Sequence, residues 1–164
     1  MLKGYIEGYY GRLFSKDSRE KLINHMGSLK MDFYLYGPKE DLYHRIEWQK
    51  TYPVEQQKIL RALTSQCKKN KIRPIFAISP GLKSSQASLS DKRNLISKIK
   101  QAKKLGFEEF AIFFDDIEHK RDQDLAKSHI EIIELVSSLD KAQENSLMIC
   151  PTVYCKSFAK GNVA

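Results

Sequence analysis

The sequence predicts an α/β protein in which parallel strands alternate with helices. Strand-like and helix-like segments alternate from one end of the chain to the other, and the strand-like runs are short and strongly apolar. One strand–helix–strand unit takes about 30 to 40 residues, the size of a crossover between parallel strands. From the residues alone, this pattern fits either a doubly wound sheet or the beginning of a (β/α)8 barrel.

The expected strands are apolar runs bounded by charged or turn-forming residues. The clearest is Glu-Phe-Ala-Ile-Phe-Phe at 109–114, which is followed directly by Asp115 and Asp116. A continuous apolar run predicts a strand covered on both faces, which is typical of parallel sheets. The full set of expected strands is Gly4–Tyr10, Asp32–Tyr36, Ile72–Ser79, Glu109–Phe114 and Leu147–Tyr154.

Helical periodicity fills the intervals between these strands, because apolar residues recur there three or four positions apart. We expect the helices to start at Ser15 or Asp17, at Pro53, after Ser90 and near Asp122. Their apolar faces are predicted to be Leu22, Ile23 and Met26; Ile59, Leu60, Leu63 and Cys67; Leu95, Ile96, Ile99 and Ala102; and Leu125, Ile132, Ile133, Val136 and Leu139.

Length and composition predict a single domain over residues 1–164, with 41% hydrophobic residues. No apolar run approaches the roughly 20 residues of a membrane span, and the N-terminus runs straight into strand-like sequence without a signal peptide. The three cysteines form no C-x-x-C pair, so neither disulfides nor a zinc site is indicated. Glycine-rich nucleotide-binding motifs are absent from the sequence. We therefore expect a cytoplasmic location, with no metal, cofactor or membrane partner.

The net charge of +8 raises the question of a nucleic-acid partner. The basic residues are spread over the ends and solvated faces of two expected helices, where lysines are common. They are not interleaved with aromatic residues, and no nucleic-acid-binding motif accompanies them. The sequence therefore predicts no nucleic-acid partner; the basic groups are Lys68, Lys69, Lys71 and Arg73, and Lys98, Lys100, Lys103 and Lys104.

Asp115 and Asp116 lie at the carboxyl end of an expected parallel strand, where α/β folds place their catalytic groups. Successive strand residues point to opposite faces, so the two carboxyls meet different surroundings and can have different pKa values. One carboxyl can then stay protonated while its neighbour is ionised. The alternative is a solvated strand end at which Asp116 caps a turn.

The other strand ends carry further candidate site residues. Gly8 and two tyrosines stand at the end of the first expected strand, where a glycine permits close approach of a ligand and tyrosines can wall a pocket or pack in the core. Lys39 follows a Gly-Pro turn after the second strand and is either an inward hydrogen-bond donor or a solvated lysine. Tyr154 follows the fifth strand and serves either a site or the rim of a barrel.

These strand-end segments form an ordered series: Gly4–Arg12, Tyr34–Asp41, Tyr43–Arg45 with Trp48, Ser79–Gly81, Phe113–Ile117 and Cys150–Thr152 with Tyr154. In this order and spacing they resemble glycoside hydrolase family 84, the O-GlcNAcase and bacterial hyaluronidase-type β-N-acetylglucosaminidases. The resemblance covers essentially the whole chain. Two departures, Arg12-Leu13-Phe14 for the family's Arg-Pro-Trp and Gly37-Pro38-Lys39 for its Ala-Pro-Lys, are expected to be tolerated.

The resemblance implies a TIM-barrel glycosidase that removes terminal β-linked N-acetylglucosamine with retention of configuration. In this family the 2-acetamido oxygen of the sugar attacks the anomeric carbon and forms an oxazoline, an exception to the usual enzyme-nucleophile scheme. By position, Asp115 would orient and polarise the acetamido N–H, and Asp116 would act as general acid and then base. Tyr154 would hydrogen-bond the acetamido group, while Lys39 and the backbone of Gly8 would contact the sugar.

The chain has 164 residues, whereas a TIM barrel usually has about 250 and rarely fewer than about 200. We therefore expect an incomplete (β/α)8 barrel, with about five parallel strands and intervening helices. Its open sheet edges predict a tendency to self-associate. The expected partner is a glycoconjugate that contains N-acetylglucosamine. The alternative function is that of a truncated, catalytically impaired carbohydrate-binding fragment of such an enzyme.

Overall fold

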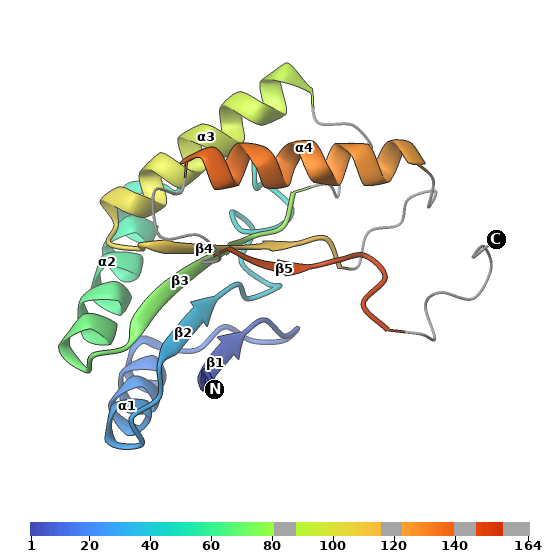
Figure 1. Ribbon diagram of the computed structural model, residues 1–164. Coiled ribbons are helices and arrows are strands. Elements are labelled where there is room, and N and C mark those ends of the chain that lie inside the picture. Colours follow the sequence, from blue (N-terminus) through green and yellow to red (C-terminus); the bar gives the residue numbers. More distant parts are fainter. Residues whose placement is uncertain (81–87, 116–122, 140–146, 156–164) are drawn as a thin grey trace.

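The computed structural model describes residues 1–80, 88–115, 123–139 and 147–155 (Figure 1). Five strands form one sheet, in which every strand runs parallel to its neighbours and lies next to the strand that precedes it in the chain. The strands are β1 Gly4–Glu7, β2 Phe33–Tyr36, β3 Arg73–Ile78, β4 Glu109–Phe113 and β5 Met148–Cys150. The helices between them are α1 Lys16–Ser28, α2 Val54–Lys69, α3 Leu89–Lys104 and α4 Gln123–Leu139.

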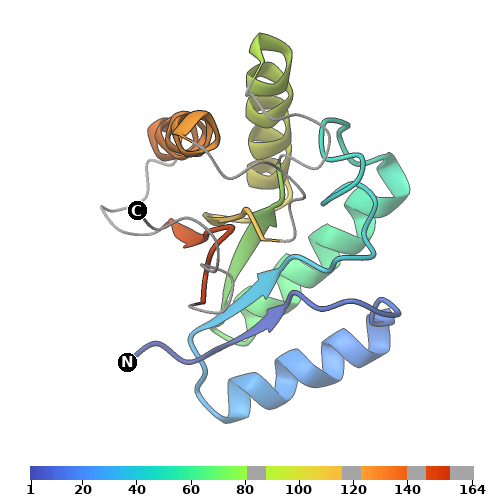
Figure 2. The same ribbon diagram turned by 90° about the vertical axis from the view of Figure 1, so that its right-hand side faces the viewer.

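The helices all lie on one side of a curled sheet, as the two views in Figures 1 and 2 show. This follows from the strand order, because crossovers between parallel strands are right-handed and each new strand here is added at the same edge. A doubly wound sheet would carry helices on both faces. The chain thus forms an incomplete α/β barrel, as the sequence predicts.

Alternation along the strands gives the sheet two different apolar faces. The convex face packs against the helices and forms the larger core, to which the sheet contributes Tyr34, Tyr36, Phe76, Phe110 and Ile112. The concave face forms a second buried cluster of Phe33, Leu35, Ile75, Ala77 and Ala111. The curl of the sheet brings these inward side chains together, as in the interior of a barrel.

Helix α1 is fixed to the edge strand β1 by a buried ion pair. Glu7 is fully buried, and its carboxylate accepts hydrogen bonds from Nε of Arg19 at 3.1 Å and from Nη2 at 2.8 Å. The hydroxyl of Tyr34 donates to the same carboxylate. Bidentate pairing of this kind fixes geometry as well as charge.

The helix starts agree with the sequence prediction in part. Ser15 caps α1, since its hydroxyl oxygen accepts from the backbone N–H of Ser18 at 3.1 Å. The prediction for α3 was wrong by two residues: Ser88 is the cap, and it accepts from the N–H of Asp91 at 3.1 Å. Ser-Leu-Ser offers two possible caps, and Ser88 is the one placed three residues before Asp91, from whose backbone N–H it accepts. Asp122 lies outside the described residues.

The strands are shorter than the apolar runs predicted. Residues 8–10 after β1 and 151–154 after β5 were expected in strands, but they have left the sheet. They include Gly8 and Tyr154, which the resemblance assigns to a site. Among residues 1–80, 88–115 and 123–139, no helix combines the length and apolar content needed to cross a membrane.

Candidate active site at the carboxyl ends of the strands

The site is built around an ion pair between Lys39 and Asp115. Lys39 follows β2 and Asp115 follows β4, and Nζ lies 2.5 Å from Oδ2. Both side chains are withdrawn from solvent, with exposed fractions of 3% and 16%. The lysine is thus not the solvated residue that one interpretation of the sequence expected.

The second carboxylate oxygen of Asp115 is buried but accepts no hydrogen bond from any residue that the structure describes. A buried acceptor without a donor costs about 1 to 3 kcal/mol, and such groups are rare in native proteins. Oδ2 is held by Lys39, whereas Oδ1 is available to an N–H or O–H donor. The arrangement therefore suits recognition of a polar group on a ligand.

The backbone that carries Lys39 is hydrogen-bonded to the segment after β1. The N–H of Gly37 donates to the carbonyl of Glu7 at 3.0 Å, and the N–H of Lys39 donates to the carbonyl of Tyr9 at 3.2 Å. Gly8 lies between these two acceptors. A Cβ added to Gly8 would lie 3.6 Å from Cε2 of Phe113, the last residue of β4. The backbone of Gly8, which carries no side chain, therefore lies beside the end of β4.

A buried carboxylate, Asp41, organises the rest of this loop. Its Oδ2 accepts from the hydroxyls of Tyr36 at 2.7 Å and Tyr52 at 2.9 Å, and its Oδ1 accepts from the N–H of Tyr43 at 2.9 Å. Burial, together with the Asp41 charge, raises the pKa of Tyr36 and Tyr52 well above 10, so both phenols remain donors. The sequence alone assigns no role to Asp41, because its buried tyrosine partners come from β2 and from just before α2, a proximity that sequence spacing does not reveal.

The segment after β5 is tied to the residue just before Asp115. The hydroxyl of Thr152 donates to the carbonyl of Phe114 at 2.8 Å, and the N–H of Phe114 donates to the carbonyl of Cys150 at 2.8 Å. Tyr154 follows on this segment with 52% of its surface exposed. The structure thus brings Gly8, Lys39 and Asp115 together and places Tyr154 beyond the neighbouring strand end. Asp116 lies outside the described residues.

Comparison with known proteins assigns the chain to a family. The family model for beta-N-acetylglucosaminidase matches residues 3–163. The protein O-GlcNAcases of Mus musculus and Rattus norvegicus are 33% and 32% identical to the chain over 171 aligned residues, which include 99% of it. The chain belongs to the β-N-acetylglucosaminidase family.

A solved structure agrees with this assignment. An O-GlcNAc hydrolase variant from Thermobaculum terrenum superposes with a TM-score of 0.84 at 29% identity, over 94% of this chain and 36% of that one. The glycoside hydrolase family 84 resemblance drawn from the strand ends is confirmed. The chain spans 18% of the length of the rodent relatives.

In this chain, Gly37 replaces the alanine of the family's Ala-Pro-Lys motif. A Cβ at this position would lie 2.8 Å from Cβ of Ala77 and 3.0 Å from Cε2 of Phe113. The close approach leaves no room for a methyl group without a shift of the backbone. Glycine therefore lets the loop lie directly against the ends of β3 and β4.

The two tyrosines after Gly8 have different surroundings. Tyr9 packs its ring edge-on against Phe14, with centroids 5.5 Å apart. Tyr10 is 55% exposed, and the guanidinium of Arg45 lies 5.1 Å from the centre of its ring. Tyr9 is thus half-buried against Phe14 rather than part of the core, whereas Tyr10 lies at the surface beside the β2 loop.

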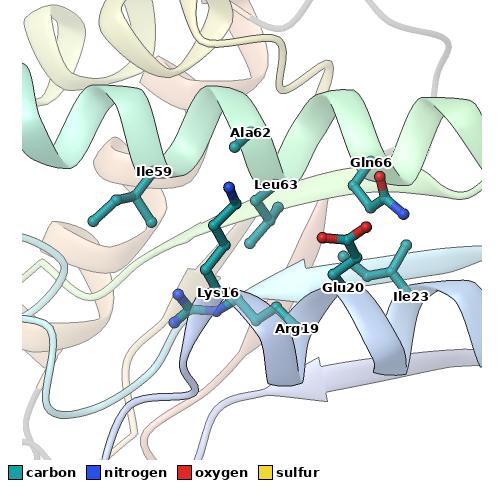
Figure 3. Close-up of a pocket in the computed structure, with 8 residues that line it drawn as sticks. All are labelled: Lys16, Arg19, Glu20, Ile23, Ile59, Ala62, Leu63 and Gln66. Atoms are coloured by element: carbon teal, nitrogen blue, oxygen red, sulfur yellow. The ribbon is translucent and has the colours of Figure 1, made fainter.

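A groove of about 250 Å³ lies between α1 and α2, on the helical side of the sheet (Figure 3). Its floor is apolar, and Lys16 and Glu20 of α1 line one side while Gln66 of α2 lines the other. Ile59, predicted as part of the apolar face of α2, lines this groove and is 44% exposed. The groove contains neither Lys39 nor Asp115, so the candidate site remains at the strand ends.

Proposed function

We propose that this chain carries the catalytic carboxyl pair of a retaining β-N-acetylglucosaminidase, which removes terminal β-linked N-acetylglucosamine from a glycoconjugate. The observation that carries the proposal is the buried Lys39–Asp115 pair with its unpartnered Oδ1, immediately before Asp116. A positioned acceptor of this kind fits the N–H of a 2-acetamido group. Family membership supports the same reaction.

Asp115 orients the substrate in this proposal. The acetamido N–H donates to Oδ1 of Asp115, while the Lys39 ammonium holds Oδ2 in place. The ionised carboxylate stabilises the positive charge that develops on the acetamido nitrogen as its carbonyl oxygen attacks the anomeric carbon. Such preorganised electrostatic stabilisation is worth about 10²- to 10³-fold in rate.

Asp116 transfers the proton. As the bond from the acetamido oxygen to the anomeric carbon forms, the glycosidic carbon–oxygen bond breaks and the leaving oxygen takes the proton of Asp116. A water then attacks the anomeric carbon of the oxazoline, gives its proton back to Asp116 and releases the acetamido oxygen. Two inversions at one carbon give net retention, and general acid–base catalysis of this kind contributes about 10²- to 10⁴-fold.

The remaining assigned residues bind the sugar. The bare backbone of Gly8 lies beside the β4 end, next to the loop that carries Lys39. Tyr154 lies beyond the adjacent strand, on a segment that Thr152 fixes to Phe114. We assign Gly8 and Lys39 to sugar contacts and the Tyr154 hydroxyl to the acetamido group.

A series of chromogenic N-acylglucosaminides with zero to three fluorines on the acetyl methyl tests this mechanism with the 164-residue chain. Fluorine withdraws electrons from the acyl oxygen, so kcat/KM should fall with each fluorine if that oxygen is the nucleophile. A matched set on a glycosidase with a carboxylate nucleophile provides the control. A kcat/KM that does not change with the number of fluorines contradicts substrate assistance. Binding of N-acetylglucosamine without any turnover favours the alternative, an impaired carbohydrate-binding fragment.

A further inference from the structure

His44 lies in the same loop as Lys39 and has a defined tautomer. Its ring is buried, with 1% exposed, and Nδ1 lies 3.0 Å from the carbonyl oxygen of Ala77. A carbonyl only accepts, so Nδ1 carries the proton. The unprotonated Nε2, which lies 3.2 Å from Oγ of Ser79, then accepts the hydroxyl proton of that serine.

These contacts join the ends of three strands. Ala77 belongs to β3 and Ser79 follows it, whereas His44 belongs to the loop after β2. The imidazole also meets the ring of Phe113 on β4 edge-on, with centroids 6.3 Å apart. The Lys39 ammonium lies 5.6 Å from the centre of that same ring. His44 and Lys39 thus contact one aromatic side chain two residues before Asp115.

The reach of Lys39 explains why its loop must be held firmly. Strands β2 and β4 are separated by β3, and two inter-strand spacings amount to about 10 Å. An extended lysine crosses that gap only if its backbone stays close to the end of β3. His44 bonds to Ala77 and Ser79, the two β3-end residues over which the loop passes.

The imidazole is surrounded by charged groups but remains neutral. The pKa of His44 is lowered to about 4, chiefly by burial and to a smaller extent by the charges of Lys39 and Lys98, while Asp41 and the bond to Ala77 oppose the shift. At neutral pH the ring is therefore a fixed donor and acceptor.

We propose that His44 is a positioning residue, whose Nδ1–H bond to Ala77 holds the β2 loop so that the Lys39 ammonium stays opposite Asp115. Its effect on catalysis rests on the proposed function, but its effect on Lys39 does not. A 1 Å misplacement of a catalytic group costs about 10²-fold in rate. The structure thus adds a third residue, besides the ion pair itself, to the machinery of the site.

The test compares two substitutions of His44, one that keeps the bond to Ala77 and one that keeps the bond to Ser79. His44→Asn places an amide N–H near the position of Nδ1, whereas His44→Gln reaches toward Ser79 and loses the bond to Ala77. In protein labelled with ¹³C-lysine, a held Lys39 gives two distinct Hε resonances, and a freely rotating Lys39 gives one averaged resonance. Lys39→Arg identifies the signal.

We expect two Hε resonances for Lys39 in the wild type and in His44→Asn, and one in His44→Gln. In the fluorine-free assay, kcat should fall about 10²-fold in His44→Gln with a much smaller change in KM. Circular dichroism of both variants confirms that they are folded, and Ser79→Ala, which spares the Ala77 bond, should keep both resonances. Two resonances in folded His44→Gln overturn the proposal. If the resonances behave as expected but the wild type has no turnover, the proposed function fails and the positioning role stands.

Discussion

The ammonium nitrogen of Lys39 lies 2.5 Å from Oδ2 of Asp115, although the two residues are 76 positions apart in the chain. They follow strands that are not neighbours, so the contact spans the end of β3. The loop that carries Lys39 lies close to the sheet there, and a Cβ on Gly37 would come within 2.8 Å of Cβ of Ala77. The pair is thus a product of barrel curvature and small side chains together.

Removing the lysine should affect both stability and catalysis. Lys39→Met leaves the largely buried Asp115 carboxylate without its cation, so we expect the free energy of unfolding to fall by about 3 kcal/mol. Urea titration measures this change. Lys58→Met, which removes one partner of a solvent-exposed pair with Glu55, is the matched control and should leave stability unchanged. If the two substitutions lowered the free energy of unfolding equally, Lys39 would not form a stabilising buried ion pair.

Neutralising Asp115 should lower catalysis as well as stability. Asp115→Asn keeps an oxygen that accepts from Lys39 but loses the negative charge. We expect kcat on a chromogenic N-acetylglucosaminide to fall about 10²- to 10³-fold. The thermal melting temperature, measured in parallel, should also fall, because the buried Lys39 ammonium no longer faces a negative charge on Asp115. A fall in melting temperature without a fall in kcat would show that Asp115 serves structure alone.

The Glu7–Arg19 pair provides a prediction about the scaffold. Glu7 is fully buried, so Arg19→Met should lower the free energy of unfolding by about 3 to 5 kcal/mol. Arg19→Lys keeps the charge but not the two-point geometry, so its loss should be intermediate. Denaturant titration of both variants checks the order. A lysine variant as stable as wild type would show that the bidentate bond contributes nothing.

His44 should make stability depend on pH. Its pKa is about 4 in the folded protein and about 6.5 when unfolded. The folded state therefore binds fewer protons between these values, and stability is lost as pH falls from 6.5 to 4. The neighbouring charges are those of Lys39, Asp41 and Lys98.

His44→Asn cannot titrate, so it isolates this contribution. The stability difference between wild type and variant should shrink by about 3 kcal/mol between pH 7 and pH 4. Urea titrations at the two pH values measure the change. If the free energies of unfolding of the wild type and of His44→Asn change with pH by the same amount, His44 is protonated as easily in the folded protein as in the unfolded chain.

The sequence predicts the fold well because its local hydrophobic patterns match the strands and helices that form. Apolar runs and helical periodicity place every described strand and helix, and short crossovers fix the parallel order. These local signals do not distinguish a barrel from a doubly wound sheet, because the two folds differ in the face of the sheet against which each helix packs. Here only the resemblance at the strand ends anticipated the barrel.

The site was predictable to a lesser degree. Lys39 and Asp115 are strand-end residues, but their contact across β3 depends on the curvature of the sheet and on the close packing of the Lys39 loop against β3, which no spacing rule encodes. The sequence alone assigns no role to Asp41 or His44. Their function comes from partners at distant positions, such as Tyr52 and Ala77, and these contacts exist only in the folded chain.

Turnover of a chromogenic β-N-acetylglucosaminide by the purified chain, measured beside its Asp116→Asn variant, tests the central claim most directly. Circular dichroism confirms that both proteins are folded. The account predicts hydrolysis by the wild type with retention of configuration, and a rate lower by about 10²-fold or more in the variant, because the general acid is lost. Equal rates in the two proteins, or no turnover by the folded wild type, would contradict it.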